Sequence, residues 1–414
     1  MSRQGSAVER LASLAGHVSQ PATPPLASIL QKHPDDIVIT LALRTPLTKA
    51  KKGGLKDTPL DAIVVKLLKH AVSKMNMDPA LVEDVALAYQ VRAAVLAAGF
   101  PTTTAAYSTN RFCASGLKVV QDIADQISKG GISCGLAIGA ESMSFSNDSF
   151  EEPYDEEVLQ NSDARDCMQP MGQTSGNVGR DFGISRELQD RYPYESFRRA
   201  EIAQKEGWFD DEIVPITTTV TNKEGVRQTV MLTKDEGPRW GTTYEALSKI
   251  RPAFKEFGDR STGGNSSQVT DGAAATLLMK RSMAERLGQP ILAKFVGATV
   301  AGLAPRIMGI GPSIAAPKLL NKFNLRIDDI DIIELNEAFA SMAVYCKDKF
   351  GIDHNKMNVR GGAIALGHPL GATGLRQIVT GLSECRRQGQ RVLLTTMCVE
   401  TGQGMAGLFI NEQL

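Results

Sequence analysis

The sequence lacks several features that would place it in a special class of protein. Its 46 Lys and Arg balance its 46 Asp and Glu, so no overall charge attracts nucleic acid or an acidic membrane surface. No apolar run reaches the roughly 18 to 20 residues that span a bilayer, and the N-terminus has no apolar stretch typical of a secretory signal. An anionic ligand must therefore be bound by local charges.

Cysteine is also scarce and scattered. The six cysteines stand at positions 113, 134, 167, 346, 385 and 398, and none belongs to a CxxC pair. This spacing argues against a disulfide framework and a thiolate zinc site, and it suits a reducing compartment in which one cysteine acts as a nucleophile. With 414 residues, 42% of them hydrophobic, the chain is long enough to bury a large core in two or three domains.

Residues 1–35 have the composition of a flexible leader, with three prolines between positions 21 and 25, and the core is expected to begin near Asp36. Arg10, Leu11, Leu14, His17 and Val18 share one face of a short helix. The pattern Arg10-Leu11, five residues, His17-Val18 resembles the N-terminal type-2 peroxisomal targeting signal, although Val18 stands where Leu or Ala is usual. The alternative is an unstructured tail with chance amphipathicity.

The body of the chain alternates predicted strands with predicted helices. Strands are expected over 36–42, 85–91, 134–139 and 273–279, with helices over 60–75 and 113–129. A second set has strands over 291–302, 330–335, 391–397 and 405–410, and a helix over 313–323. This alternation predicts an α/β protein with mostly parallel sheets and two similar halves.

Between about 157 and 251 the chain becomes polar and charged, with helical spacing near 186–206 and extended spacing near 212–233. Such an insertion in an α/β enzyme commonly covers a site. The predicted division is a leader (1–35), a first half (36–156 and 252–288), an inserted loop domain (157–251) and a second half (289–414).

The first segment that could carry chemistry is NRFCASGL at 110–117. It places Cys113 at the start of a predicted helix, where partial positive charge and unpaired N–H groups stabilise a thiolate and can donate to an oxyanion. In isolation, a small buried residue in a tight strand-to-helix turn fits Cys113 equally well.

The second segment is GGAIALGHPLG at 361–371. Its glycines let the backbone approach a ligand closely, and His368 can accept a thiol proton at physiological pH. Taken alone, the segment suggests a nucleotide-binding loop almost as well, although its glycine spacing and the absence of a lysine do not fit a Walker loop.

Two further segments follow buried strands. Cys398 lies in MCVETGQG at 397–404, where packing is the better explanation if the residue is viewed alone. Asn336 and Glu337 begin NEAFA at 336–340, and each needs partners if buried, since an unpaired polar group costs about 1 to 3 kcal/mol.

These segments together carry a resemblance to a known family. Over roughly 36–411 the sequence resembles the thiolase family, and is most similar to the degradative, peroxisomal-type 3-ketoacyl-CoA thiolases. Further segments support it: MGQTSGNV at 171–178, ISRELQD at 184–190, TGGNSSQVTDGAAA at 262–275 and PRIMGIGP at 305–312. The resemblance implies two βαβαβ-type halves in a layered α/β/α/β/α arrangement, an inserted loop domain and a homodimer.

The implied activity is that of an acyltransferase in the last step of fatty-acid β-oxidation. It cleaves 3-ketoacyl-CoA with CoA, giving acetyl-CoA and a shortened acyl-CoA through an acyl-Cys113 intermediate. His368 removes the Cys113 proton, and Cys398 protonates the acetyl-CoA enolate and later deprotonates CoA. Asn336 holds a water that forms one oxyanion site with His368. The backbone N–H groups of Cys113 and Glu400 form the other.

By the same resemblance, Met171, Arg239, Ser267 and Phe339 line the CoA and substrate site. Arg239 supplies the local positive charge that the neutral chain otherwise lacks. CoA is a substrate, and neither a metal nor a further cofactor is implied. The implied partners are CoA, 3-ketoacyl-CoA, a second copy of the chain and a peroxisomal import receptor, and the implied location is the peroxisome.

The chain departs from the family pattern at three positions. The usual Cys-x-Gly-x-Gly-x-Gly has Glu400 at its first glycine, where a positive φ would cost about 1 kcal/mol or more. The carboxylate would stand close to the forming enolate, where it would repel negative charge or raise the pKa of Cys398. Gly264 and Gly176 replace a usual alanine and glutamate, and are expected to matter little for the chemistry.

Two alternatives remain from the sequence. One is a biosynthetic acetoacetyl-CoA thiolase, which PRIMGIGP at 305–312 disfavours. The other is a non-catalytic CoA- or lipid-binding homologue impaired at Glu400, which retention of the four catalytic side chains disfavours. Ketoacyl synthases are disfavoured strongly, because they place a second histidine where this chain has Asn336.

Overall fold

The computed structural model describes residues 25–87, 92–146 and 154–414. The described residues form one mixed sheet in the order β10-β11-β12-β9-β1-β8-β5-β3-β4, with β2 (Thr48–Lys49) beside β8, and a separate hairpin of β6 and β7. The predicted targeting pattern at 10–18 lies outside the described residues. Within them, no helix is both long and apolar enough to cross a membrane.

Besides β2, the first half of the sheet contains five strands within the described residues. They are β1 (Ile37–Arg44), β8 (Thr270–Lys280), β5 (Cys134–Ser142), β3 (Asp84–Leu87) and β4 (Ala105–Ser108). Strand β8 runs antiparallel to both β1 and β5, whereas β5, β3 and β4 run parallel. The predicted strand over 85–91 is described only to Leu87, because 88–91 lie outside the described residues.

The second half repeats this pattern. It consists of β9 (Ala293–Gly302), β12 (Gln403–Asn411), β11 (Val392–Val399) and β10 (Ile332–Leu335). Strand β12 is antiparallel to β9 and β11, and β11 is parallel to β10. The halves join where β1 pairs with β9 at Val38 and Lys294. The predicted similarity of the two halves is confirmed. The predicted mostly parallel pairing is wrong, because β8 and β12 each run antiparallel to both of their long neighbours.

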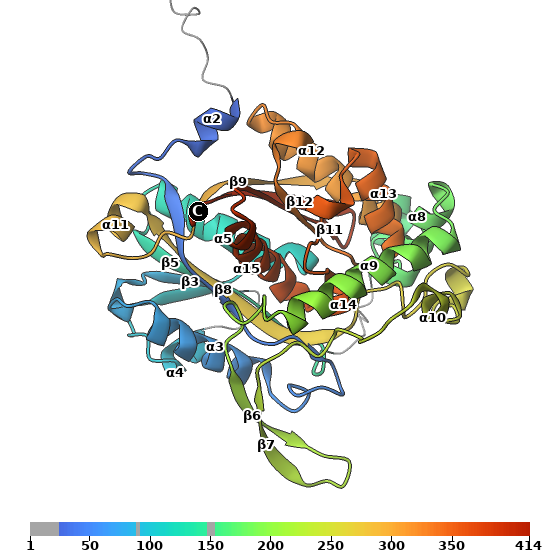
Figure 1. The fold of residues 1–414 in the computed structure, drawn as a ribbon, viewed down its shortest axis with the longest axis horizontal. Coiled ribbons are helices and arrows are strands. Elements are labelled where there is room, and N and C mark those ends of the chain that lie inside the picture. Colours follow the sequence, from blue (N-terminus) through green and yellow to red (C-terminus); the bar gives the residue numbers. More distant parts are fainter. Residues whose placement is uncertain (1–24, 88–91, 147–153) are drawn as a thin grey trace, which may run out of the picture.

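The helices complete five layers (Figure 1). The central layer, between the two halves of the sheet, holds α5 (Ser115–Ser128) and α15 (Leu370–Gln388). The outer layer on the first half holds α3 (Leu60–Lys74) and α4 (Arg92–Ala97), and that on the second half holds α12 (Pro312–Lys322) and α13 (Ala340–Phe350). This is the α/β/α/β/α arrangement that the family resemblance implies.

Short elements connect these layers. They are α11 (Arg281–Arg286), α14 (Ala363–Leu366) and the 3-10 turns η1 (Pro79–Leu81), η2 (Phe112–Ala114), η3 (Lys255–Phe257), η4 (Pro305–Ile310), η5 (Ile327–Asp329) and η6 (His354–Lys356). The central helices are almost wholly buried because apolar side chains cover several of their faces, as a layer packed between two sheets requires.

The chain leaves the first half after Ser142 and returns at Thr270. This inserted segment holds α6 (Glu156–Gln160), α7 (Ser162–Asp166), α8 (Met171–Asp181), α9 (Arg186–Lys205), β6 (Ile216–Thr221), β7 (Arg227–Leu232) and α10 (Tyr244–Ser248). In the second half the equivalent connection, from β11 to β12, is only a tight turn at 400–402. The insertion therefore follows β5, whose counterpart in the second half is β11, the strand that carries Cys398 near its end.

A helix also lies within the segment predicted to be a flexible leader. Residues Pro25–Leu30 form α2, whose Ile29 is buried. The Lys294 ammonium donates to the carbonyl of Gln31 (2.6 Å), and Lys32 forms an ion pair with Glu412 (2.9 Å). The chain thus packs on the core before the predicted boundary at Asp36, because apolar residues of α2 contact it.

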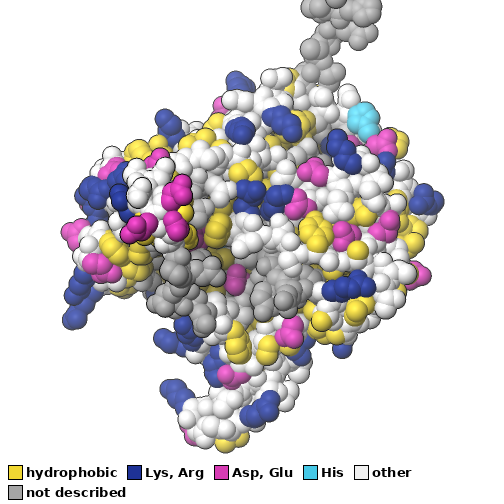
Figure 2. Space-filling model, turned by 180° about the vertical axis from the view of Figure 1, so that it is seen from behind, with side chains coloured by type: hydrophobic (Ala, Val, Ile, Leu, Met, Phe, Trp, Pro, Cys, Tyr) yellow, Lys and Arg dark blue, Asp and Glu magenta, His cyan; other side chains and the backbone are white. Residues whose placement is uncertain are grey.

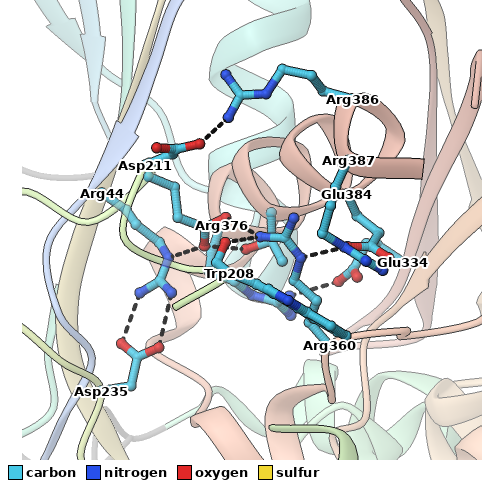
Figure 3. A network of polar contacts seen from close by, with 12 residues as sticks. Arg44, Trp208, Asp211, Asp235, Glu334, Arg360, Arg376, Glu384, Arg386 and Arg387 are labelled. Carbon is cyan, nitrogen blue, oxygen red and sulfur yellow. Dashed lines mark hydrogen bonds and ion pairs between the residues drawn. The ribbon is translucent and has the colours of Figure 1, made fainter. Parts of the chain in front are cut away.

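A buried ionic network joins the insertion to both halves (Figure 3). Arg44, at the end of β1, binds Glu212 (2.6 Å) and Asp235 (2.7 Å) of the insertion. Arg360 of the second half binds Glu384 (2.6 Å) and approaches Glu212 (3.4 Å). Because each charge has an opposite partner, burial is tolerated and the three parts are held in one register.

Candidate active site

Cys113 lies in η2, immediately before α5, at the junction of the two halves. The turn is held by its neighbours: the Phe112 N–H donates to Asn110 Oδ1 (2.7 Å), and the Arg111 N–H donates to Ser115 Oγ (2.9 Å). Phe112 has a φ of 47°, a left-handed conformation that is uncommon for a bulky residue. The prediction of a tight turn at a helix start is confirmed, with backbone strain beside the thiol.

Cys113 is buried, and the backbone N–H groups of Glu400 and of Cys113 itself act to lower the pKa of its thiol. Burial, followed by the proximity of Cys398 and of the Glu400 carboxylate, raises the pKa of Cys113 well above its ordinary value. Burial therefore outweighs the stabilisation of a thiolate that the helix start was expected to give. The resting group is a thiol, and a base is needed to remove its proton.

His368 is brought beside η2 by the close packing of α15 on α5. A Cβ on Gly116 would lie 2.7 Å from the backbone nitrogen of Leu375, so only glycine permits this approach. Gly367, with a φ of 114°, turns the chain into α15, and the His368 N–H donates to the carbonyl of Gln268 (3.0 Å). The first turns of the two helices thus lie side by side.

Both ring nitrogens of His368 have partners. Nε2 lies 3.2 Å from Nδ2 of Asn336, and Nδ1 lies 2.6 Å from Oγ1 of Thr373. Burial, and then the charge of Arg376, lower the pKa of His368 to about 3. The ring is therefore neutral at physiological pH and can accept a proton.

Asn336 follows β10, where its N–H donates to the carbonyl of Thr396 (2.9 Å). Its Oδ1 is buried and has no hydrogen-bond partner among the described residues. A buried amide oxygen without a partner is costly, so this atom is placed to bind a water or a ligand beside His368.

Cys398 lies near the end of β11, opposite Gly404 of β12. Burial, and then the nearby Cys346, raise the pKa of Cys398 to about 12. The side chain belongs to an apolar cluster with Phe339 and Met308, against which the partly buried Met171 packs. Two of the predicted CoA-site residues, Met171 and Phe339, therefore lie with Cys398.

The other two predicted CoA-site residues lie on neighbouring loops. The Ser267 N–H donates to the carbonyl of Ala338 (2.9 Å), directly before Phe339. Arg239 is exposed, and its guanidinium lies 5.3 Å from the centre of the Phe197 ring. Among the described residues it forms no ion pair with a carboxylate, which leaves its charge available to an anion.

Glu400 adopts no positive φ; the left-handed residues of this turn are Thr401 (φ 66°) and Gly402 (φ 85°). The backbone cost considered for Glu400 does not arise, and the strain falls on the β-branched Thr401 instead. Burial raises the pKa of the Glu400 carboxyl. The Glu400 carboxylate raises the pKa of Cys113, whereas the neighbour that raises the pKa of Cys398 is Cys346, so the expected effect of Glu400 on Cys398 is not found.

Two site residues were not singled out from the sequence for their roles. Glu337 is buried, and its carboxylate accepts hydrogen bonds from Tyr192, Ser196, Asn358 and Ile364. Thr373 contacts the ring of His368. The sequence signal for Glu337 was its position beside Asn336 after a buried strand, whereas a threonine inside a predicted helix gives no such signal. Within the described part of the chain, no group of three His, Cys, Asp or Glu side chains could hold a metal ion.

Comparisons with known proteins agree with this arrangement. The family models of the thiolase N-terminal domain and the thiolase C-terminal domain match residues 37–282 and 289–411. A peroxisomal 3-ketoacyl-CoA thiolase of Yarrowia lipolytica is 45% identical, covering 98% of this chain and 100% of the relative. The peroxisomal 3-ketoacyl-CoA thiolase of Homo sapiens is 42% identical, over 97% of this chain and 99% of the relative.

Solved structures are similar over nearly the whole chain. The dimeric peroxisomal thiolase of Saccharomyces cerevisiae has a TM-score of 0.86 and 42% identity, covering 93% of this chain and 100% of that one. An acetyl-CoA acetyltransferase of Bacillus anthracis has a TM-score of 0.82 and 34% identity, covering 91% and 99% of the two chains.

Proposed function

The chain belongs to the thiolase family, and from this premise we propose that it cleaves 3-ketoacyl-CoA with CoA to acetyl-CoA and a shortened acyl-CoA. The observation that carries the proposal is the packing of α15, which begins just after the buried, neutral His368, against η2, which carries Cys113. Cys398 influences the same thiol. The similarity to peroxisomal 3-ketoacyl-CoA thiolases along the whole chain supports this substrate class.

In the first half-reaction, Nε2 of His368 takes the proton of Cys113, and the sulfur attacks the 3-keto carbon. The bond between C2 and C3 breaks, leaving an acyl group on Cys113 and the enolate of acetyl-CoA. Cys398 gives its proton to C2 of the enolate, and acetyl-CoA departs. Covalent catalysis thus divides one difficult displacement into two easier steps.

In the second half-reaction, the Cys398 thiolate takes the proton of an incoming CoA thiol. The CoA sulfur attacks the Cys113 thioester, and the shortened acyl-CoA leaves. His368 returns its proton to the Cys113 sulfur, so both cysteines end as thiols. The high pKa of Cys398 suits this shuttle, because a strongly basic thiolate takes the CoA proton readily.

Two sets of hydrogen-bond donors stabilise the oxyanions that develop during the reaction. The backbone N–H groups of Cys113 and Glu400, both of which influence the Cys113 thiol, form one. His368 and a water on Asn336 form the other, and the unpartnered Oδ1 of Asn336 supports this role. Each well-placed donor typically lowers the barrier by about 2.7 to 4 kcal/mol.

CoA binds as a substrate, and the mechanism uses no cofactor. Met171 and Phe339 provide apolar contact beside Cys398, Ser267 adds a polar group, and Arg239 binds an anionic part of CoA. The predicted loop domain at 157–251 supplies Met171 and Arg239, and the first half supplies Ser267. These assignments follow from placement in the fold and from the family resemblance.

The protein acts in the peroxisome as a homodimer, as its relatives' names and the dimeric yeast structure support. We also assign Arg10, Leu11, His17 and Val18 to a signal read by an import receptor.

The decisive experiment measures thiolysis of acetoacetyl-CoA and of a long 3-ketoacyl-CoA by the wild type, Cys113→Ala and Glu400→Gly. Cleavage of the long substrate that is lost in Cys113→Ala supports the proposal. Cleavage of acetoacetyl-CoA alone favours the biosynthetic reaction. An inert wild type that Glu400→Gly activates identifies a blocked oxyanion site, and inertness of both leaves the binding-protein alternative.

A further inference from the structure

The surroundings of the His368 Nδ1 atom carry an inference beyond the roles given above. Thr373 lies in the first turns of α15 and is fully buried. Its hydroxyl donates to the carbonyl of Pro369 (2.8 Å), and the same oxygen lies 2.6 Å from Nδ1 of His368. A hydroxyl has one proton to give, so an oxygen that donates to Pro369 must accept from the ring.

We propose that Thr373 is a positioning residue that fixes His368 in the tautomer protonated at Nδ1, leaving the Nε2 lone pair as the base for Cys113. The proposal rests on the proposed role of His368. Once Nδ1 carries the proton, Nε2 needs a donor, and the Asn336 amide nitrogen lies 3.2 Å away. The unpartnered Asn336 Oδ1 then points elsewhere, as observed.

The opposite direction of the hydrogen bond between Thr373 and His368 is incompatible with proton transfer from Cys113 to His368. If the Thr373 hydroxyl donated to Nδ1, Nε2 would carry the ring proton and could not take that of Cys113. After proton transfer both ring nitrogens carry protons, and a donating hydroxyl would face an N–H group. An accepting hydroxyl satisfies Nδ1 both before and after the transfer, so the ring can change charge without rearrangement at Thr373.

A hydroxyl in this place differs from the carboxylate that often orients a catalytic histidine. The charged neighbour that influences the His368 pKa is Arg376, and no carboxylate contributes. Thr373 therefore sets the tautomer without stabilising an imidazolium, which keeps the ring ready to give its proton back to sulfur at the end of the cycle.

The test compares Thr373→Val, which keeps the shape and removes the hydroxyl, with Thr373→Ser, which retains it. Thr276→Val is the matched control, because Thr276 is buried and its hydroxyl has no partner among the described residues. The chain has 5 histidines, so ¹⁵N-histidine NMR of the whole protein, with His368→Asn for assignment, reports the ring tautomer. The rate at which iodoacetamide alkylates Cys113, measured on the peptide that contains this residue, reports how well His368 removes the thiol proton.

We expect the wild type, Thr276→Val and Thr373→Ser to carry the ring proton on Nδ1 and to alkylate at similar rates. Thr373→Val should move the proton to Nε2 and slow alkylation by roughly 100- to 1000-fold, within the range that general-base catalysis contributes. A wild-type ring protonated at Nε2 would overturn the proposal even if Thr373→Val did not fold. So would a Thr373→Val ring that keeps its proton on Nδ1, or unchanged alkylation. Neither readout needs turnover, so a wild type without thiolysis refutes the proposed function while the tautomer remains measurable.

Discussion

Replacing Glu337 by glutamine should weaken both the fold and the catalytic loops. The carboxylate is fully buried. One oxygen accepts from the Tyr192 hydroxyl (3.0 Å) and from Nδ2 of Asn358 (2.7 Å). The other accepts from the Ser196 hydroxyl (2.7 Å) and from the Ile364 N–H (3.2 Å). These contacts link α9 of the insertion to the segments that carry Asn336 and His368.

The magnitude follows from the geometry of the donors. In Glu337→Gln one oxygen becomes an NH₂ group, which must face either Asn358 or Ile364, and neither can reverse. The Asn358 amide is held by Leu335 on both its atoms, and the Ile364 donor is backbone. Losing one or two bonds to a charged acceptor, at about 1.5 to 3 kcal/mol each, gives a destabilisation of roughly 1.5 to 6 kcal/mol.

The assay combines thermal unfolding with thiolysis kinetics. At about 2.1 cal/mol/K of unfolding entropy per residue, a chain of 414 residues loses roughly 1 °C of Tm per kcal/mol, so a fall of about 2 to 7 °C is expected. Because Asn336 and the loop before His368 lose support, kcat should fall more than KM rises. Tyr192→Phe removes a single donor and should cost about half as much or less.

The reasoning is refuted if Glu337→Gln unfolds within about 1 °C of the wild type and keeps its kcat. Loss of stability with unchanged kcat would assign Glu337 to the fold alone. A large fall in kcat that Tyr192→Phe reproduces without loss of stability would show instead that the phenol, rather than the carboxylate, positions the loops.

Three further changes test other parts of the structure. Arg44→Met leaves buried carboxylates without their partner and should lower the free energy of unfolding by about 3 to 5 kcal/mol in denaturant titrations; the Arg44→Met/Asp235→Leu variant should recover part of this loss, and strict additivity would contradict the network. Glu400→Gln removes a charge that raises the pKa of Cys113, so alkylation of Cys113 at neutral pH should quicken by roughly 3- to 10-fold, and a slower rate would reverse the assigned sign. Since the pKa of His368 is lowered from 6.5 to about 3, its contribution is complete above pH 6.5 and is lost as the pH falls toward 3. The wild type should therefore lose up to about 1.4 kcal/mol per pH unit in that window relative to His368→Asn, and parallel stability curves would rule out a buried neutral ring.

The distribution of charge on the surface bears on how an anionic substrate is bound. On the face seen in Figure 2, basic and acidic side chains are interspersed, as the balanced composition predicts. The proposed function therefore requires single placed groups such as Arg239 to bind the anionic substrate. No broad field of one sign is available on this face to guide CoA.

The amino-acid sequence by itself determined the order of strands and helices, the similarity of the two halves and the residues with chemical potential. Hydrophobic periodicity identifies elements such as α3 and α9 because it is local, and Cys113, Asn336, His368 and Cys398 stand in segments specific enough to indicate the family. Prediction was weaker where local signals were weak. The short β4 and α14, and the helix α2 within the expected leader, carry too few residues for a period to show.

Only the tertiary structure decided how these groups behave. Glycines at 116 and 367 let two helix starts meet, and the resulting burial reversed the expected ease of forming a Cys113 thiolate. The structure also places a positive φ of the 400–402 turn at Thr401, whereas the sequence had raised this question for Glu400. The partners of Glu337 and the contact between Thr373 and His368 depend on distances between atoms and on the loss of water around them. A pattern of residue types does not encode the cost of desolvation, because that cost exists only once the chain has packed around the group.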